Sequence, residues 1–154
     1  MSTPKVELRP MTVGEYPEFK EKLATTFATA IGPARGLTSE EALNVSYAET
    51  EKLLPDGPDT EQQLLWVAMA DGVLVGMLWI TTRARLPFVY GVEVAADQRG
   101  KGYGRAIMLA AEEECRRRGY DALELNVFGD NATAIGLYDS LGYVVTSQQM
   151  RKSL

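Results

Sequence analysis

Histidine is absent from the 154 residues, and cysteine occurs only once, at Cys115. The lack of histidine excludes His-based metal sites and both the Ser-His-Asp and the Cys-His catalytic arrangements. A single cysteine also excludes thiolate zinc sites and an intramolecular disulfide. Any acid–base chemistry must therefore use Asp, Glu, Tyr, Lys or water, and we predict no metal site.

Excess positive charge and long apolar runs are also missing. The 16 Lys and Arg against 21 Asp and Glu give a net charge of −5, which disfavours nucleic-acid binding because that binding requires basic residues. No apolar run approaches the ~20 residues of a membrane span. Residues 1–7 lack the apolar core of a secretion signal. We expect a soluble, cytoplasmic protein with neither nucleic acid nor membrane as partner.

The length and composition fit one folded domain over residues 1–154. A hydrophobic content of 45% and a charged content of 24% are ordinary for a globular domain of this size. Apolar periodicity, capping boxes and turn residues predict helices and strands along the chain. The predicted helices cover about 13–29, 39–54, 102–118 and 131–141, and the predicted strands about 6–9, 64–70, 73–81, 88–95, 122–127 and 143–150.

This order of elements predicts a mixed α/β domain in three layers. Asp71-Gly72 between two apolar runs is a strong hairpin signal. The strand 88–95, the helix 102–118 and the strand 122–127 form a βαβ unit within a largely antiparallel sheet. In the strand 88–95, we expect Tyr90 to share a face with Val92 and Val94, and Val89 to share the opposite face with Glu93.

The turn after the strand 88–95 is the most informative stretch. Its three glycines let a ligand oxygen approach the backbone N–H groups closely, and the following helix directs its free N–H groups and positive dipole end into the turn. This predicts a phosphate site. The alternative is a plain strand–helix connection with no ligand. The residues of the turn are Arg99, Gly100, Lys101, Gly102, Tyr103, Gly104 and Arg105.

A second feature is the spacing of Asn131 and Tyr138. Seven residues are two helical turns, so both side chains lie on one face of the predicted helix 131–141. Without this spacing, Tyr138 would be read as a core aromatic residue with its hydroxyl at the surface.

These two segments resemble the GNAT superfamily of N-acetyltransferases. Residues 99–104 resemble its acyl-CoA motif, Arg/Gln-x-x-Gly-x-Gly/Ala, and residues 126–143 resemble its Asn…Ala…Leu-Tyr…Gly-Phe region, with Tyr143 in place of Phe. The element order matches over nearly the whole chain. The resemblance implies a GNAT-like fold: a twisted, mostly antiparallel central sheet with helices on both faces and a splayed parallel pair of strands.

The resemblance also implies an activity, the direct transfer of an acetyl group from acetyl-CoA to a primary amine of a small molecule or peptide in a ternary complex. The turn 99–105 would bind the pyrophosphate, and Val92 and Val94 would pair with the pantetheine arm. Asn131 would hydrogen-bond that arm, and Tyr138 would protonate the departing thiolate. A bulge near residues 93–95 would present the Val94 N–H to the oxyanion.

The acceptor amine must lose a proton before it reacts. An amine of pKa about 10.4 is neutral in about 1 part in 2,500 at pH 7, a cost of about 4–5 kcal/mol. Glu93, on the strand beside the thioester, is our hypothesis for the base, and an ordinary solvated carboxylate is the alternative. A water held by Asn126 and a relay through Tyr90 are further routes. We expect Cys115 to be a buried structural thiol rather than an acyl carrier.

Two other functions stay open. A nucleotide-binding module is disfavoured because Arg105 stands where the third glycine of G-x-G-x-x-G is needed, although Glu124 lies about where an acidic partner would. A non-catalytic acyl-CoA-binding domain on the same fold would bind acetyl-CoA without turnover.

The sequence does not identify the acceptor amine, although acidic residues at 49–61 would favour a cationic one. A homodimer is compatible with the sequence.

Overall fold

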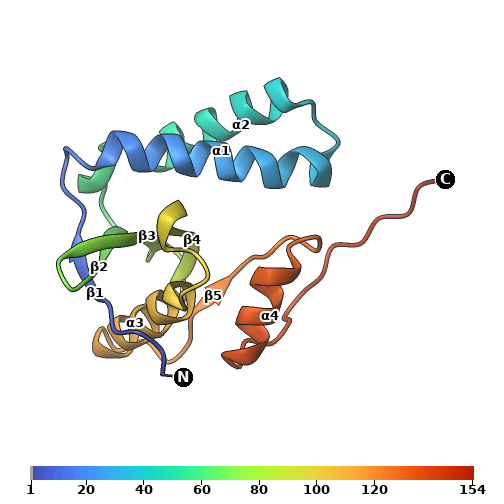
Figure 1. The fold of residues 1–154 in the computed structure, drawn as a ribbon. Coiled ribbons are helices and arrows are strands. Elements are labelled where there is room, and N and C mark those ends of the chain that lie inside the picture. The colour runs from blue at the N-terminus through green and yellow to red at the C-terminus, as the bar shows by residue number, and fades with distance from the viewer. Residues whose placement is uncertain (1) are drawn as a thin grey trace.

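The computed structural model describes residues 2–154, which form one five-stranded sheet with helices on both faces (Figure 1). The strands lie in the order β1-β2-β3-β4-β5. All neighbouring pairs are antiparallel except β4 and β5. The elements are β1 (Glu7–Pro10), α1 (Tyr16–Arg35), α2 (Ser39–Leu53), η1 (Gly57–Asp59), β2 (Gln63–Ala70), β3 (Val73–Thr81), β4 (Phe88–Val94), η2 (Ala96–Gln98), α3 (Tyr103–Arg117), β5 (Glu124–Leu125) and α4 (Ala132–Ser140).

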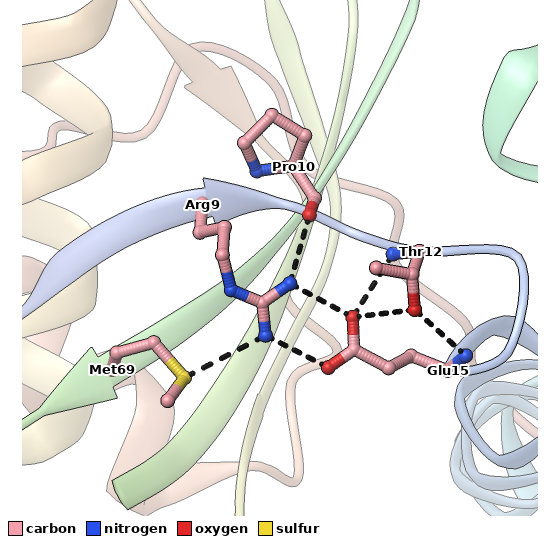
Figure 2. A network of polar contacts seen from close by, with 5 residues as sticks. All are labelled: Arg9, Pro10, Thr12, Glu15 and Met69. Carbon is pink, nitrogen blue, oxygen red and sulfur yellow. Dashed lines mark hydrogen bonds and ion pairs between the residues drawn. The ribbon is translucent and has the colours of Figure 1, made fainter. Parts of the chain in front are cut away.

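The junction of β1 and α1 is held by the polar network in Figure 2. Arg9 donates two hydrogen bonds to the carboxylate of Glu15, at 3.1 and 2.9 Å. The predicted capping box forms, since the Thr12 N–H donates to Glu15 Oε1 and the Glu15 N–H donates to Thr12 Oγ1. The helix nevertheless begins only at Tyr16. The bond from Arg9 and then that from the Thr12 backbone lower the pKa of Glu15 to about 2.

Two helices cover one face of the sheet and a third covers the other (Figure 1). Phe19 of α1 packs in one apolar cluster with Trp79 of β3. On the opposite face, Ile107 and Met108 of α3 pack in a second cluster with Leu78 of β3. The three layers predicted from the sequence are therefore confirmed.

The helix α1 runs about six residues beyond its predicted end and includes Pro33 in its last turns. The prediction of a loop at 31–36 was wrong because packing outweighs the local Gly-Pro signal: Ile31 and Gly32 are buried. A Cβ on Gly32 would lie 3.6 Å from the Cβ of Ala42, so α2 lies close at this point. Gly36, with φ of 68°, ends the helix.

The strands β2 and β3 form the predicted hairpin. Asp71 and Gly72 have φ values of 48° and 78°, the left-handed pair that a two-residue type I′ turn requires. Ala70 pairs with Val73 directly across the turn.

The irregularity in β4 lies at a different place from the one predicted. Trp79 pairs with Gly91, but the next residue, Ile80, pairs with Val89, so Tyr90 is the extra residue of a bulge. The expected bulge near 93–95 is wrong, because regular pairing continues to Val94. The oxyanion role given to a bulged Val94 N–H therefore loses its structural basis.

The bulge also overturns the predicted faces of β4. An extra residue resets the alternation of side chains along a strand. Val89 consequently packs on the α3 side with Val92 and Val94, rather than opposite them. Tyr90 instead stacks on Trp79, which belongs to the cluster beneath α1.

The C-terminal part departs most from the prediction. The strand β5 covers two residues rather than 122–127, and its parallel pairing ends at Val89 with Leu125. The helix α4 forms as predicted, with the Asn131 side chain accepting the Ala134 N–H at its N-terminus. The strand predicted at 143–150 is absent, because no neighbouring strand pairs with it. Residues 144–154, the C-terminal tail, run out exposed from the body (Figure 1).

No helix within residues 2–154 has both the length and the apolar character needed to cross a membrane.

Candidate active site

The glycine turn before α3 is open and rich in backbone donors. Gly100 and Gly102 have φ values of 75° and 87°, a left-handed conformation that side chains other than glycine rarely adopt. A Cβ on Gly100 would meet nothing within 4 Å. No side chain caps the helix at Gly102, so the N–H groups of its first turn face the glycine turn. This geometry fits the oxygens of a phosphate group.

The cations of the turn contact the protein itself. Arg99 Nη2 lies 3.4 Å from Glu93 Oε1, and Lys101 Nζ lies 3.3 Å from Gln98 Oε1. Arg105 donates to Ser140 Oγ and so links the turn to α4. The three predicted cations are present at the turn, but each contacts another side chain of the protein. The backbone N–H groups of the helix start are the donors that face the turn.

Gly104 lies inside the first turn of α3, where three elements meet. A Cβ there would lie 3.5 Å from Leu137 Cδ2 of α4 and 3.9 Å from Val94 Cγ2 of β4. The space at Gly104 therefore sets how closely α4 approaches the turn. Tyr103 beside it is half-buried and packs against the cluster on the α3 face.

The strands β4 and β5 separate beside this turn. Their pairing covers only Phe88 with Glu124 and Val89 with Leu125. Within the described chain, the β5-side edge of β4 from Tyr90 onward has no strand partner. Val92 and Val94 lie on this open stretch, so an extended ligand with amide groups can pair with the strand backbone as an added strand does.

Tyr138 is on α4, whereas Asn131 is the N-cap residue that precedes this helix, with non-helical φ and ψ of −91° and 73°. Tyr138 is half-buried, which raises the pKa of its hydroxyl, and its ring lies edge-on to Tyr143 at 5.8 Å. Asn131 is exposed, and its carbonyl oxygen accepts the Ala134 N–H at 3.2 Å. The amide NH₂ of Asn131 is the part of this side chain that can donate to a ligand.

Tyr138 lines a long groove of about 980 Å³. The groove is bounded by α1 and α2, by β4, by residues 125–129, by α4 and by the C-terminal tail. Aromatic rings line one part of it: Tyr90 lies 4.6 Å from Trp79 and 5.4 Å from Phe88, centroid to centroid. Trp79 is fixed by its Nε1–H, which donates to Gln63 Oε1 at 2.7 Å.

Trp79 and Phe88 were missed from the sequence as site residues, and Tyr90 was considered only for a proton relay. The signal available was the alternation of Phe88 and Tyr90 along a strand. That pattern placed them on one face with Val92, because a bulge leaves no clear mark in the sequence.

Glu93 does not line the groove that contains Tyr138. It borders a separate cavity of about 60 Å³ together with Lys22 of α1. The Glu93 side chain is 23% exposed, and burial raises the pKa of its carboxyl against the lowering effects of Arg99, a hydrogen bond from Thr26 and the charge of Lys22. The two predicted catalytic side chains therefore border different cavities, both of which α1 helps to line.

Cys115 is buried within α3, and burial raises the pKa of its thiol. A protonated thiol at this position has the features of a structural residue, as expected from the sequence.

An open glycine turn at a helix start, a parted strand pair beside it and a tyrosine-bearing helix define the arrangement of a GNAT acetyltransferase. The chain matches the Acetyltransferase (GNAT) family model over residues 35–143. It is 31% identical over 152 residues to the uncharacterized N-acetyltransferase YdgE of Bacillus subtilis, covering 96% of this chain and 97% of that protein. The chain therefore belongs to the GNAT acetyltransferase family, and the fold and family predicted from its sequence are confirmed.

Solved structures extend the comparison. YycN of Bacillus subtilis, described as an acetyltransferase, superposes with a TM-score of 0.91 at 29% identity over 97% of this chain and 99% of that one. The PaiA N-acetyltransferase of Thermoplasma acidophilum, solved in complex with coenzyme A, shares the fold with a TM-score of 0.63 at 18% identity, over 97% and 94% of the two chains.

Proposed function

We propose that this acetyltransferase moves the acetyl group of acetyl-CoA directly to a primary amine of a small molecule or peptide. The observation that supports the proposal is the meeting of three elements at Gly104: the uncapped start of α3, the edge of β4 beyond its pairing with β5, and α4, which carries Tyr138. A pyrophosphate, an amide-bearing arm and a thioester follow each other in that order along acetyl-CoA.

The chain's residues hold this co-substrate along these three elements. The backbone N–H groups at residues 100–105 bind the pyrophosphate, and the side chains of Arg99, Lys101 and Arg105 add charge to that end after turning from their present partners. Val92 and Val94 pair with the arm through their backbone groups. Asn131 donates its amide N–H to the arm while its carbonyl keeps capping α4.

Tyr138 holds the proton that the departing sulfur requires. The attacking nitrogen forms a bond to the carbonyl carbon of the acetyl group, the bond from that carbon to sulfur breaks, and the Tyr138 hydroxyl donates its proton to the sulfur. Burial raises the pKa of Tyr138, so the hydroxyl stays protonated at neutral pH. The attacking nitrogen releases its second proton to solvent as the amide forms, and the phenolate regains a proton from solvent.

Glu93 accepts the proton of the incoming ammonium group. Because Glu93 borders the smaller cavity rather than the groove, water carries the proton between them. The raised pKa makes this carboxylate a stronger base than an exposed glutamate. Its contact with Arg99 is given up when Arg99 turns to the co-substrate, which frees the carboxylate to accept a proton.

The acceptor enters the groove beside the rings of Trp79, Phe88 and Tyr90, which fit an amine with an apolar body. The acidic residues that would favour a strongly cationic acceptor are partly neutralised. Glu49 pairs with Arg35 at 3.1 Å, and Glu51 pairs with Lys20.

The test is thiol release from acetyl-CoA by the full chain against a panel of amines, with acetyl-CoA binding followed separately by calorimetry. We expect binding together with turnover that depends on the amine, fastest for amines with an apolar body. Binding without turnover on any amine would establish the non-catalytic acyl-CoA-binding domain instead. The absence of binding would refute both.

A further inference from the structure

The turn at the end of α4 ties Tyr143 to Tyr138. Gly142, with φ of 93°, reverses the chain after the helix. Its N–H donates to the Asp139 carbonyl at 3.0 Å, and the Tyr143 N–H donates to the Tyr138 carbonyl at 3.0 Å. These are the two bonds of a Schellman motif, in which the side chains of the outer residues also come into contact. The rings of Tyr143 and Tyr138 lie edge-on at 5.8 Å, so the position of one ring constrains the other.

The hydroxyl of Tyr143 connects this turn to α3. It donates a hydrogen bond to Glu112 Oε2 at 3.0 Å. The Glu112 side chain is 17% exposed, and its other oxygen lies 3.7 Å from Arg116 Nη2. Burial and then the bond to Glu112 raise the pKa of Tyr143, so the hydroxyl stays protonated and keeps donating at neutral pH. Phenylalanine, which stands here in the motif that residues 126–143 resemble, could not form this bond.

The two tyrosines differ in what their hydroxyls contact, although both line the groove. The Tyr143 hydroxyl is bonded to Glu112. For Tyr138, burial is the cause of the raised pKa, and no hydrogen bond contributes to it. The Tyr143 hydroxyl is therefore engaged in holding the helix end, whereas the Tyr138 hydroxyl is left to donate to a ligand.

Few polar contacts hold α4 against α3. The helix buries none of its nine residues. Within the described chain, two side-chain hydrogen bonds join residues 132–143 to α3, one from Tyr143 to Glu112 and one from Arg105 to Ser140. In the proposed function Arg105 turns to the pyrophosphate. The bond from Tyr143 is then the one that persists while acetyl-CoA is bound.

We propose that Tyr143 is a positioning residue for Tyr138, and that its hydrogen bond to Glu112 keeps α4 docked on α3 during acetyl transfer. This role rests on the proposed function, in which Tyr138 protonates the departing sulfur. A proton donor must lie within hydrogen-bond reach of the atom that it protonates. A displacement of about 1 Å can slow a reaction by about 100-fold, so the docking of α4 controls the rate.

The first test compares Tyr143→Phe with Tyr138→Phe and the unchanged chain in steady-state acetyl transfer. Loss of one hydrogen bond to a charged group should lower kcat of Tyr143→Phe by about 10-fold and leave the KM for acetyl-CoA unchanged. Tyr120→Phe, at a half-buried tyrosine that packs on the same cluster but does not line the groove, is the matched control and should keep both. An unchanged kcat for Tyr143→Phe where Tyr138→Phe is slow, or a KM that rises as kcat falls, overturns the proposal.

A second test removes the other partner of the bond. Glu112→Ala should slow turnover as much as Tyr143→Phe, and the double variant should be no slower, because both side chains act through one bond. Glu112→Gln keeps an acceptor oxygen and should recover part of the rate. Glu113→Ala, which also removes a carboxylate beside Arg116, at 3.5 Å, is the matched control and should keep the rate. Losses that multiply in the double variant would contradict the shared bond.

Hydrogen exchange distinguishes the docking of α4 from its part in catalysis. The backbone N–H groups of α4 should exchange faster in Tyr143→Phe than in Tyr120→Phe or the unchanged chain. If Tyr138→Phe keeps full turnover, the proposed role of Tyr138 fails, and faster exchange in Tyr143→Phe still supports the docking. Equal exchange in the three proteins overturns the docking itself.

Discussion

Residues 2–115 and residues 116–154 differ in how their structure is maintained. The first region contains every buried residue of the described chain and both faces of the sheet core. The second region contributes α4 and the tail, which are half-buried or exposed. Yet the second region supplies Tyr138 and Asn131 to the proposed site, whereas the first supplies the glycine turn and Glu93.

This difference indicates a division of roles. The binding turn is built on α3, a helix fixed by Ile107 and Met108 at 0% exposure. Tyr138, the proposed proton donor, is on α4, which packs against the α3-side cluster through Tyr138 and Leu141 but buries none of its own residues. The proposed binding turn is therefore built on a well-buried helix and the proposed proton donor on a partly exposed one.

The largest predicted effect is a difference between the two regions in how much a Leu→Ala substitution lowers the free energy of unfolding. Leu78→Ala removes a side chain that is 0% exposed in the sheet core and should destabilise the fold by about 2–5 kcal/mol. Leu137→Ala makes the same change in half-buried α4 and should cost less than half as much. Urea unfolding of the two variants measures both costs. Equal losses would show that α4 is as well packed as the core.

The next effect should come from the proposed base. Glu93→Gln should lower kcat by about 100-fold. Because burial raises the pKa of Glu93, unmodified activity should rise with pH through that raised pKa, as the carboxylate becomes able to accept a proton. The rate–pH profile of the variant should lose this rise. Glu18→Gln, in the same small cavity, is the control and should keep the profile. An unchanged profile for Glu93→Gln would remove this assignment.

A substitution at the glycine turn should affect binding rather than chemistry. Gly102→Val forces a branched side chain into a φ of 87° and brings its Cβ to 3.2 Å from Pro4 Cδ, which distorts the turn that presents the N–H groups of the helix start, so acetyl-CoA affinity should fall by about 10- to 100-fold. Gly119→Val imposes the same strain at a φ of 89°, at the other end of α3. Calorimetry should find tight binding for Gly119→Val only. Equal weakening in both variants would assign the loss to strain.

The smallest effect concerns the network of Figure 2, which joins β1 to the start of α1. The pKa of Glu15 is lowered to about 2. The ionised carboxylate therefore stabilises the folded state fully above its ordinary pKa of about 4.5, and this stabilisation is lost as the pH falls toward 2. Glu15→Gln should reduce the acid sensitivity of the unfolding midpoint slightly, because the pair is largely exposed. Midpoints measured between pH 7 and pH 3 should converge for the variant and the unchanged chain. Parallel curves would contradict this account.

The sequence predicted most of the first region because its signals are local. The hairpin at Asp71-Gly72, the capping box at Thr38 and the turn at 99–105 depend on neighbouring residues, and each was found. The bulge at Tyr90 and the helical conformation at Pro33 depend on packing against distant elements, which local patterns do not record. The predicted strand at 143–150 failed for a related reason: its composition favours a strand, but β5, the neighbouring edge strand, covers only two residues and does not pair with it.

The distinction between local signals and packing of distant elements also applies to the candidate site. Tyr138 lies on the predicted helix and Asn131 at its N-cap, while the binding and catalytic roles of these residues and of the turn stay predictions. The separation of Glu93 from Tyr138 into two cavities follows from the path of α1 over β4, which sequence spacing does not contain.

The most direct test of the central claim is the rate of thiol release by Tyr138→Phe at saturating acetyl-CoA, with the best acceptor amine from the panel. The account predicts that acetyl-CoA affinity is kept while turnover falls by about 100-fold or more. Tyr47→Phe, which removes an exposed hydroxyl that donates to Glu21 at a residue that does not line the groove, should leave both unchanged. Full turnover by Tyr138→Phe would contradict the role of α4 in catalysis.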